Sequence, residues 1–263
     1  MIGNKVIVAI PARSGSIGIK DKNIQKVHEK ELLLRTFVHA NYLRMRFNTK
    51  LVVTSDSEDF LKLIIRLLNL ELEDFTKSEN LYFREDVFLH LRPPALATSE
   101  TLISESLFFL RESFVKLGLN FDIWVLMQPT TPFRSKLSLD EIGRLAVRVE
   151  NDKNYSLVSL TDVEDMHPAR MYTVSNQKAS SLNGFQDSYY KRRQDLSKVY
   201  IRDGAFYLIG DNLIRDQIQY SKNPDYVIQS YPWTINIDKW QDLELSRQLS
   251  SDLVKDDPNY ERL

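Results

Sequence analysis

The sequence predicts an α/β fold in which helices cover both faces of a mostly parallel, twisted sheet. Short apolar stretches alternate with amphipathic stretches through residues 1–160. The apolar stretches are continuous, which is typical of strands that are buried on both faces. Polar loops at 11–23, 55–58 and 128–134 each follow a predicted strand. In such a Rossmann-like sheet the carboxyl ends of the strands meet at one edge, so we expect these loops to surround one ligand crevice.

The individual elements follow from local patterns. Apolar residues at 103, 107, 110, 114 and 117 repeat at a helical spacing and define one buried face. Ser138, with Glu141 three residues later, has the pattern of a capping box and predicts a helix that begins at residue 139. The predicted order is strand 6–12, helix 31–47, strand 51–54, helix 59–70, helix 101–117, strand 122–128, helix 139–150 and strand 156–160.

Two segments interrupt this alternation within what we interpret as a single domain, residues 1–263. Residues 71–86 are charged and aromatic without a clear period, and we interpret them as a local insertion. Residues 162–198 are polar and contain Tyr189 and Tyr190 followed by a basic run. A structureless excursion of about 35 residues is unusual in a compact domain, which argues against a merely floppy segment.

Composition excludes several classes of function. The net charge of −1 gives no electrostatic case for binding nucleic acid or an anionic membrane. The absence of cysteine excludes disulfides, zinc thiolate sites and cysteine nucleophiles. The chain has neither a signal-peptide pattern nor a run that approaches 18 apolar residues. We therefore expect a cytoplasmic protein that does not enter a membrane.

The stretch VIVAIPARSGSIGIKDKN, residues 6–23, combines a buried strand with a basic, glycine-containing loop. Glycine allows positive φ, so that successive N–H groups of such a loop can turn toward one anion. Arg13 can form a bidentate contact with phosphate oxygens, and Lys22 can act as a point charge. The spacing matches neither G-x-x-x-x-G-K-[ST] nor G-x-G-x-x-G. An ordinary strand-to-helix connection with solvated lysines is therefore the alternative.

The same loop, IPARSGSIGIKDKN, resembles the signature loop of the CMP-sugar synthetases, cytidylyltransferases that activate sialic acid and related nine-carbon acids. Four later stretches resemble the same family in the same order and extend the match over nearly the whole chain. They are LVVTSDSED from Leu51, RPPALA from Arg92, LMQPTTPFR from Leu126, and the pair DGAFYL and INID from Asp203 and Ile235.

The resemblance implies that the chain uses CTP to activate an acidic nine-carbon sugar, with Mg²⁺ as cofactor. It implies a homodimer in which the arm, residues 162–198, packs on the second subunit and completes its sugar pocket. The implied catalytic residues are Arg13, Lys22 and Asp238, and Asp238 with Asn236 would hold the metal. The implied nucleotide-binding residues are Arg13, Ser14, Gly15, Ser16, Lys22, Asn23 and Arg92. The implied substrate-binding residues are Gln128, Arg192, Arg193, Asp203 and Tyr207.

Several of these motif residues have structural alternatives. Asp56 can contact substrate or, with Ser55, begin the next helix, and we favour the helix start. Arg134 can be a surface ion pair, and a lone histidine such as His167 is more often structural. Asp238 is also placed to cap the last helix, with Gln241 at the third position.

Four positions depart from the family pattern. Ile17 stands where the phosphate loop usually has lysine, and Ser99 where an acidic residue is common. Asp203 stands where asparagine is usual, and Asn236 where the first aspartate of the metal pair is expected. If strands 204–209 and 234–238 are neighbours, Asp203 can replace the charge that is lost at Asn236.

These departures leave two alternatives to an active cytidylyltransferase of nonulosonic acids. One is a catalytically weakened paralogue that acts as a nucleotide-binding or regulatory subunit. The other is a related nucleotidyltransferase that uses another sugar, as the Kdo-activating relatives do. The residues do not distinguish a sialic, legionaminic or pseudaminic type of acid.

Overall fold

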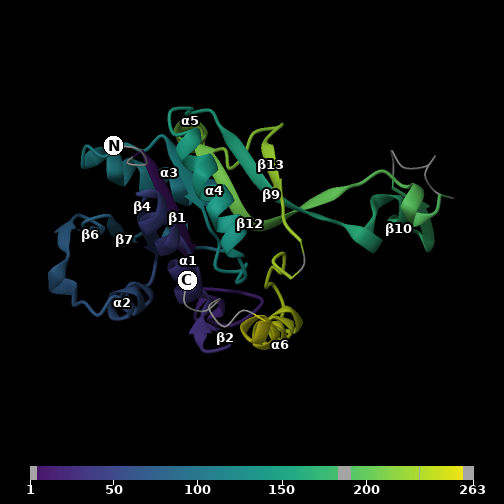
Figure 1. Cartoon of the computed structure of the whole chain (residues 1–263), viewed down its shortest axis with the longest axis horizontal. Coiled ribbons are helices and arrows are strands. Elements are labelled where there is room, and N and C mark those ends of the chain that lie inside the picture. Colours follow the sequence, from purple (N-terminus) through teal and green to yellow (C-terminus); the bar gives the residue numbers. More distant parts are fainter. Residues whose placement is uncertain (1–4, 183–190, 231, 257–263) are drawn as a thin grey trace.

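The computed structural model describes residues 5–182, 191–230 and 232–256. Its strands include β1 (Val6–Ala12), β4 (Lys50–Ser55), β5 (Thr76–Ser78), β6 (Leu81–Arg84), β7 (Val87–Leu91), β8 (Ile123–Leu126), β9 (Ser156–Asp162), β12 (Tyr200–Gly210) and β13 (Asp225–Ile228). These form one nine-stranded sheet in the order β13-β9-β12-β8-β1-β4-β7-β6-β5 (Figure 1). Within this sheet only β6 and β12 run against the common direction. The predicted mostly parallel sheet is confirmed.

The helices cover both faces of this sheet, as predicted. They are α1 (Leu32–Phe47), α2 (Glu58–Leu67), α3 (Ile103–Lys116), α4 (Lys136–Arg148) and α5 (Asp211–Arg215). The last helix, α6 (Trp240–Asp256), packs instead beside the short strand β2 (Lys26–Val27). Side chains of β1 alternate between two apolar clusters: Val8 packs with residues of α1, α2 and α4, whereas Ile7 packs with residues of α3 and α5. Both faces of the central strands are therefore buried, which explains why their sequences are apolar without alternation.

Helix boundaries agree with the predictions except at two ends. Helix α2 ends at Leu67, earlier than expected. Helix α4 begins at Lys136, and its cap is Ser135, whose hydroxyl accepts a hydrogen bond from the Ser138 N–H at 3.0 Å. The predicted capping box on Ser138 is therefore wrong. Ser138 lies inside the first turn and donates its hydroxyl to Gln229 at 2.8 Å.

Residues 71–86, which we interpreted as a local insertion, extend the main sheet. They contain the hairpin of β5 and β6, and β6 pairs antiparallel with β7 so that Phe83 faces Phe88. The sequence showed no period there because the two strands are short and mostly exposed on one side.

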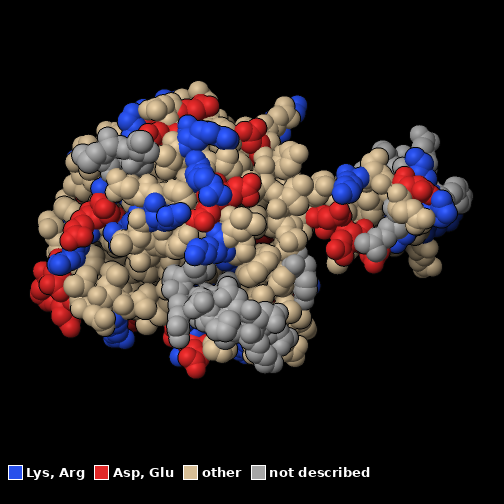
Figure 2. Space-filling model, in the orientation of Figure 1, with Lys and Arg blue, Asp and Glu red and all other residues tan. Residues whose placement is uncertain are grey.

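The described parts of the arm, residues 162–182 and 191–198, stand away from the body of the molecule (Figures 1 and 2). The far part of the arm contains the antiparallel strands β10 (Tyr172–Ser175) and β11 (Lys178–Ser181). At its base, His167 Nδ1 accepts from the Ala169 N–H at 3.0 Å, and Nε2 lies 2.9 Å from the Ser197 carbonyl. His167 is thus structural, as expected. Tyr189 and Tyr190 lie outside the described residues.

The segment before α6 is irregular, so the predicted strand 234–238 is wrong. The Ile237 N–H donates to the Thr130 carbonyl at 2.7 Å, and Ile237 is buried in a small apolar cluster with Phe133. This docking brings residues near the end of the chain onto the loop that follows β8. None of the helices among the described residues is long and apolar enough to cross a membrane.

Candidate active site

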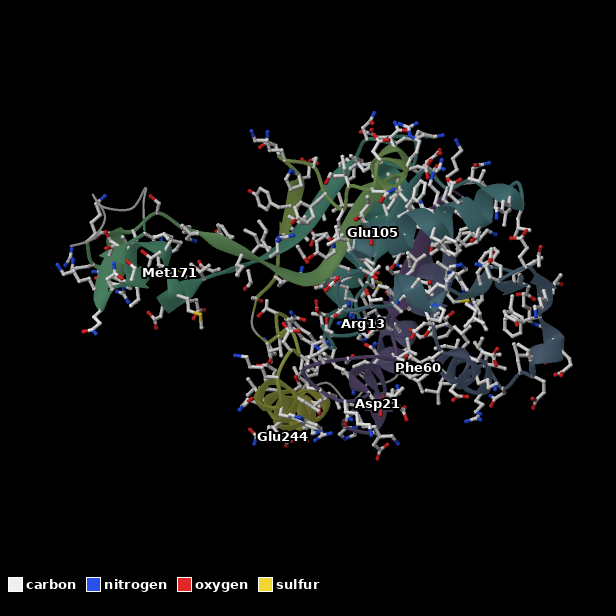
Figure 3. The ribbon with its side chains drawn as sticks, turned by 180° about the vertical axis from the view of Figure 1, so that it is seen from behind. Arg13, Asp21, Phe60, Glu105, Met171 and Glu244 are labelled. Atoms are coloured by element: carbon white, nitrogen blue, oxygen red, sulfur yellow. The ribbon has the colours of Figure 1, made fainter. Side chains whose placement is uncertain are left out.

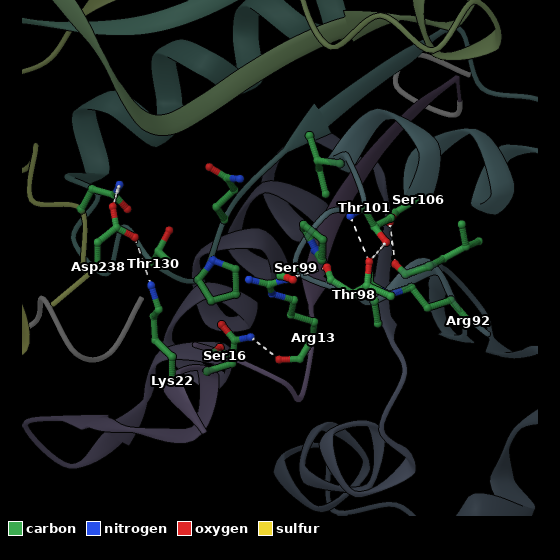
Figure 4. Close-up of a pocket in the computed structure, with 18 residues that line it drawn as sticks. Arg13, Ser16, Lys22, Arg92, Thr98, Ser99, Thr101, Ser106, Thr130 and Asp238 are labelled. Atoms are coloured by element: carbon green, nitrogen blue, oxygen red, sulfur yellow. Dashed lines mark hydrogen bonds and ion pairs between the residues drawn. The ribbon is translucent and has the colours of Figure 1, made fainter. Parts of the chain in front are cut away.

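A cavity of about 350 Å³ lies at the carboxyl ends of β1, β7 and β8 (Figure 4). Its lining comes from the loop after β1, residues 92–106, the loop after β8 and the segment before α6. Two of the three polar loops that were predicted to share a crevice, 11–23 and 128–134, line this cavity, whereas none of its lining residues belongs to the loop 55–58. The expected site residues that line it are Arg13, Ser16, Lys22, Asn23, Arg92, Gln128, Asn236 and Asp238.

One end of the cavity holds Lys22 and the carboxylate of Asp238. Lys22 Nζ lies 3.0 Å from Asp238 Oδ1 and donates to the Ile237 carbonyl at 2.8 Å. The Asn236 amide donates to the other carboxylate oxygen, Oδ2, at 3.2 Å. The Asp238 side chain is 66% exposed, so it presents its charge to the cavity. Asp242, in the first turn of α6, accepts from the Asp238 N–H at 2.9 Å. Among the described residues, the Asp238 carboxylate bonds to Lys22 and Asn236 rather than to N–H groups of α6, so the capping alternative for Asp238 is wrong.

Arg13 lies between the two ends of the cavity. Arg13 directly follows β1, and its Nη1 donates to the Thr98 carbonyl at 2.6 Å across the cavity. The buried Asn23 donates to the Arg13 carbonyl at 2.8 Å and folds the loop back on itself. A Cβ on Gly18 would lie 2.6 Å from the Asp238 carbonyl oxygen. Glycine there lets the loop pack directly on the segment before α6.

The other end of the cavity is formed by Arg92 and a group of hydroxyls. Arg92 is 4% exposed, and its Nε has no hydrogen-bond partner among the described residues. Burial lowers the pKa of Arg92. The positive charge of Arg13 lowers this pKa further, whereas the negative charge of Asp56 raises it. Thr98 and Thr101 share a hydrogen bond of 2.8 Å nearby. A buried cation beside several hydroxyls can recognise a planar polar ring with acceptor atoms.

Four expected site residues outside the arm do not line the cavity. The Ser14 N–H and hydroxyl both bond to Asp56, and Gly15 faces open space. Tyr207 is buried in the sheet and stacks on Tyr220, and burial raises its pKa. Asp203 is buried on β12, accepts from Ser159 and from the Ala205 N–H, and has a pKa raised by burial.

Asp203 cannot take the place of the charge lost at Asn236. The neighbours of β12 in the sheet are β8 and β9, and the segment that contains Asn236 is not a strand. Asp203 is also absent from the cavity lining, whereas Asp238 belongs to it. The proposed substitution of one carboxylate for the other is therefore wrong.

The arm residues lie apart from the cavity of their own chain. Arg192 is 75% exposed and pairs with Asp195 at 2.9 Å. Arg193 begins a short 3-10 helix, Arg193–Asp195, and its side chain lies outside the described part of the structure. Of the departures from the family pattern, Ser99 lines the cavity and Ile17 is exposed on the loop.

Sequence reasoning missed two structural partners of the site. Asp56 neither begins α2, whose cap is Ser57, nor lines the cavity; it bonds to Ser14. Arg134 is fully buried, so the surface ion pair is wrong; it donates to the carbonyls of Ala205 and Gln128 at 3.1 and 2.8 Å. The only sequence signal for the roles of Asp56 and Arg134 was that each motif contains a charged residue.

The oxygen atoms near Asp238 bear on the expected magnesium site. Within the described residues, no group of three or more His, Cys, Asp or Glu side chains could hold a metal ion. Asp238 and Asn236 adjoin and line the cavity, so they provide one carboxylate and one amide oxygen. Magnesium is commonly held by one or two carboxylates together with substrate phosphates and water. The residues present fit such a shared site.

The chain is similar in sequence to known cytidylyltransferases. No family profile matches the chain. It is 28% identical over 204 residues to an N-acylneuraminate cytidylyltransferase of Escherichia coli O18:K1:H7, covering 78% of this chain and 42% of that enzyme. The chain thus spans about two fifths of the length of the first such relatives. It is 24% identical over 248 residues to a CMP-N,N'-diacetyllegionaminic acid synthase of Legionella pneumophila, covering 93% and 96% of the two chains.

The fold is also that of a solved cytidylyltransferase. The structure of CMP:2-keto-3-deoxy-manno-octonic acid synthetase complexed with CTP matches 95% of this chain and 100% of that one, with a TM-score of 0.59 and 14% identity. At that identity the likeness concerns the fold alone. In sequence the chain is similar to enzymes named for CMP-activation of sialic and legionaminic acids, and in fold it is similar to a solved CMP-sugar synthetase.

Proposed function

We propose that this protein is a cytidylyltransferase that activates a nonulosonic acid with CTP, giving a CMP-sugar and pyrophosphate. The observation that carries the proposal is the joint lining of one cavity by three cationic side chains, Arg13, Lys22 and Arg92, and one carboxylate, Asp238. The curated relatives named for sialic and legionaminic acids support the same reaction class.

In the proposed reaction, the anomeric hydroxyl of the sugar gives up its proton to solvent as its oxygen forms a bond to the α-phosphorus of CTP. The bond from that phosphorus to the departing pyrophosphate breaks at the same centre. Negative charge therefore moves toward the leaving group, and Arg13 and Lys22 would stabilise it from fixed positions. No covalent enzyme intermediate is needed, so positioning and electrostatics carry the rate.

The two ends of the cavity would divide the substrates between them. Arg92 lines the cavity and would read the cytosine through its O2 and N3 acceptors, because a guanidinium group carries several N–H donors. Gln128 lines the cavity on the loop after β8 and would contact the sugar. Arg134 holds the Gln128 carbonyl and so limits the movement of that loop.

We also propose that Asp238 and Asn236 hold Mg²⁺ together with the nucleotide phosphates. A bound magnesium ion would neutralise phosphate oxygens. Asp238 contacts Lys22 in this structure, so Lys22 and the magnesium ion would both contact the same carboxylate. The amide of Asn236 is a weaker ligand than a second aspartate, which predicts a lower metal affinity than a paired-carboxylate site has.

A homodimer that shares the arm is the proposed assembly. Figure 3 shows Met171 on the arm well apart from Arg13 at the cavity. Met171, Tyr172 and Val174 are exposed on the arm, which suits burial against a second copy. Arg192 would then approach the sugar carboxylate in the partner's cavity. Use of CTP, a nucleotide made in the cytoplasm, supports a cytoplasmic location.

A pyrophosphate-release assay tests the function. The chain is incubated with CTP, Mg²⁺ and, separately, sialic, legionaminic, pseudaminic and 2-keto-3-deoxy-manno-octonic acids. We expect release with one of the first three. Saturable CTP binding without release with any acid would favour the regulatory-subunit alternative. Release with the octonic acid alone would favour the alternative of a related nucleotidyltransferase.

A further inference from the structure

Asp56 joins the loop after β4 to the loop after β1. Its Oδ1 accepts from the Ser14 N–H at 2.9 Å, and its Oδ2 accepts from the Ser14 hydroxyl at 2.5 Å. The two strands are adjacent and parallel, with Ala12 opposite Ser55, so the loops leave the sheet side by side. Both carboxylate oxygens are thus used by one residue of the loop that lines the cavity.

The peptide unit between Arg13 and Ser14 is held at both of its polar groups. Its N–H, that of Ser14, bonds to Asp56, and its carbonyl, that of Arg13, accepts from Asn23 at 2.8 Å. Two bonds on opposite sides fix the orientation of the peptide plane. The direction in which the Arg13 side chain leaves the backbone is then restricted to the one that reaches the Thr98 carbonyl at 2.6 Å.

The charge of Asp56 also lies near the two arginines of the cavity. It opposes the lowering of the Arg92 pKa by burial, whereas Arg13 adds to that lowering. Arg13 and Arg92 are therefore close enough to repel each other, and Asp56 offsets part of the repulsion. Asp56 therefore acts on Arg92 through its charge and on the backbone beside Arg13 through its hydrogen bonds to Ser14.

The start of helix α2 does not account for Asp56. The Ser57 hydroxyl accepts from the Phe60 N–H, and the Ser55 hydroxyl accepts from the Ser57 N–H at 3.1 Å. These serines serve the first turn without Asp56. The carboxylate faces the loop after β1 and has no bond to its own helix among those the structure shows.

We propose that Asp56 is a positioning residue that fixes the Arg13–Ser14 peptide, so that Arg13 is held in place for the phosphates of the nucleotide. The inference deepens the proposed function and rests on it. It predicts a larger defect in binding the phosphates than in binding the cytosine, because both hydrogen bonds that the structure shows for the Asp56 carboxylate go to the loop after β1, whereas Arg92 feels only its charge.

The test compares Asp56→Ala and Asp56→Asn with the wild-type chain by calorimetric titration of CTP and, separately, of cytidine. We expect Asp56→Ala to weaken CTP binding about tenfold, roughly the loss of one charge-assisted hydrogen bond. Its affinity for cytidine should fall by a smaller factor, because Asp56 acts on Arg92 only through its charge. Asp56→Asn keeps an acceptor for the Ser14 N–H and gains a donor for its hydroxyl, so it should restore CTP affinity to within about threefold. In turnover, KM for CTP should rise while KM for the sugar does not.

Asp59→Asn is the matched control, because Asp59 is an exposed carboxylate in the first turn of α2. It should bind CTP as the wild type does. Equal losses of CTP and cytidine binding in Asp56→Ala, or no loss of either, would overturn the inference. If Asp56→Ala does not fold, Ser14→Ala is tested in its place, because it removes only the bond from the Ser14 hydroxyl to Asp56. Its losses of affinity for CTP and for cytidine are then compared in the same way.

The failure of this inference can be told from the failure of the proposed function. A wild-type chain that binds neither CTP nor cytidine overturns the function and this inference with it. A wild-type chain that binds CTP, alongside an Asp56→Ala variant that binds it equally well, overturns the inference alone.

Discussion

Arg13 and Lys22 differ from Lys20, a third basic residue of the same loop, in what their side chains reach. Arg13 and Lys22 line the cavity and contact Thr98 and Asp238, whereas Lys20 is exposed outside it. Three cations close together in sequence therefore have different surroundings. The difference makes Lys20 a natural control for any effect of charge alone.

We expect Arg13→Ala to lower kcat/KM for CTP about a hundredfold, because it removes a fixed donor from the place where phosphate charge develops. Both a higher KM and a lower kcat should appear in steady-state pyrophosphate release. Lys20→Ala removes an equal charge and should change kcat/KM less than about threefold. Normal kinetics for the Arg13 variant would contradict the assignment of the site.

His90 is a second residue with a measurable consequence, this time for stability. It is fully buried on β7, with Nδ1 2.8 Å from Thr54 Oγ1 and Nε2 2.8 Å from the Asn80 amide. Burial, helped by the charge of Arg92, lowers its pKa to about 3. The Asn80 amide donates to Nε2, so the neutral ring carries its proton on Nδ1 and donates to Thr54.

This predicts an acid-sensitive fold. Unfolded, His90 binds a proton below about pH 6.5, whereas the folded state resists protonation down to about pH 3. The unfolded state thus binds more protons in this window, and stability falls as pH falls, by at most about 1.4 kcal/mol per pH unit from this one group. Between pH 4.5 and 7.5, the urea concentration at the unfolding midpoint should change less steeply with pH for His90→Asn than for the wild type. His28→Asn, at an exposed histidine, should leave the slope unchanged; an equally steep slope in His90→Asn would refute the assignment.

The loop after β1 works as an element through two close approaches. Asn23 folds it back onto the Arg13 carbonyl, and Gly18 brings its middle against the segment before α6. Lys22 and Asp238, more than 200 residues apart in the chain, can meet only because these backbones touch. The element's shape thus depends on a residue that has no side chain.

Gly18→Ala should separate the loop from the segment before α6. The added Cβ would lie 2.6 Å from the Asp238 carbonyl oxygen, a backbone atom that cannot swing aside as a side chain can. We expect KM for CTP to rise about tenfold, because Lys22 would shift by about a few tenths of an ångström to 1 Å. Gly15→Ala should have a smaller effect, because its Cβ would meet no atom within 4 Å. Equal effects of the two substitutions would contradict the packing argument.

The molecule as a whole consists of a body that holds the cavity and an arm that stands clear of it (Figures 1 and 2). All the residues that line the cavity belong to the body. The arm carries exposed apolar side chains such as Val174 and the exposed Arg192. These features suit contact with a second copy of the chain.

Replacement of residues 172–181 by a short Gly-Ser linker tests the arm. We expect the wild-type chain to sediment as a dimer and the shortened chain as a monomer. CTP binding should persist, because the shortened chain keeps its whole cavity, while KM for the sugar should rise at least tenfold. A monomeric wild-type chain, or a shortened chain that still dimerises, would contradict the proposed assembly.

The sequence alone determined the layered sheet, the order of most of its strands and helices, and the common edge of the loops. Continuous apolar strands and helical periodicity are local patterns, and burial on both sheet faces makes them strong. The resemblance then named the cavity residues, such as Arg13, Arg92 and Asp238, because they sit in contiguous motifs.

Only the tertiary structure decided how the polar side chains pair. Asp56 serves Ser14 rather than its own helix, Arg134 is buried against Gln128, and Asp203 is enclosed by β12 and β9. A polar side chain takes whichever partner the packed backbones bring within about 3 Å, and that partner comes from a different loop or strand. An apolar repeat can be read from the sequence of a single helix or strand. A hydrogen bond between two loops, in contrast, forms only after the sheet has placed the two loops side by side.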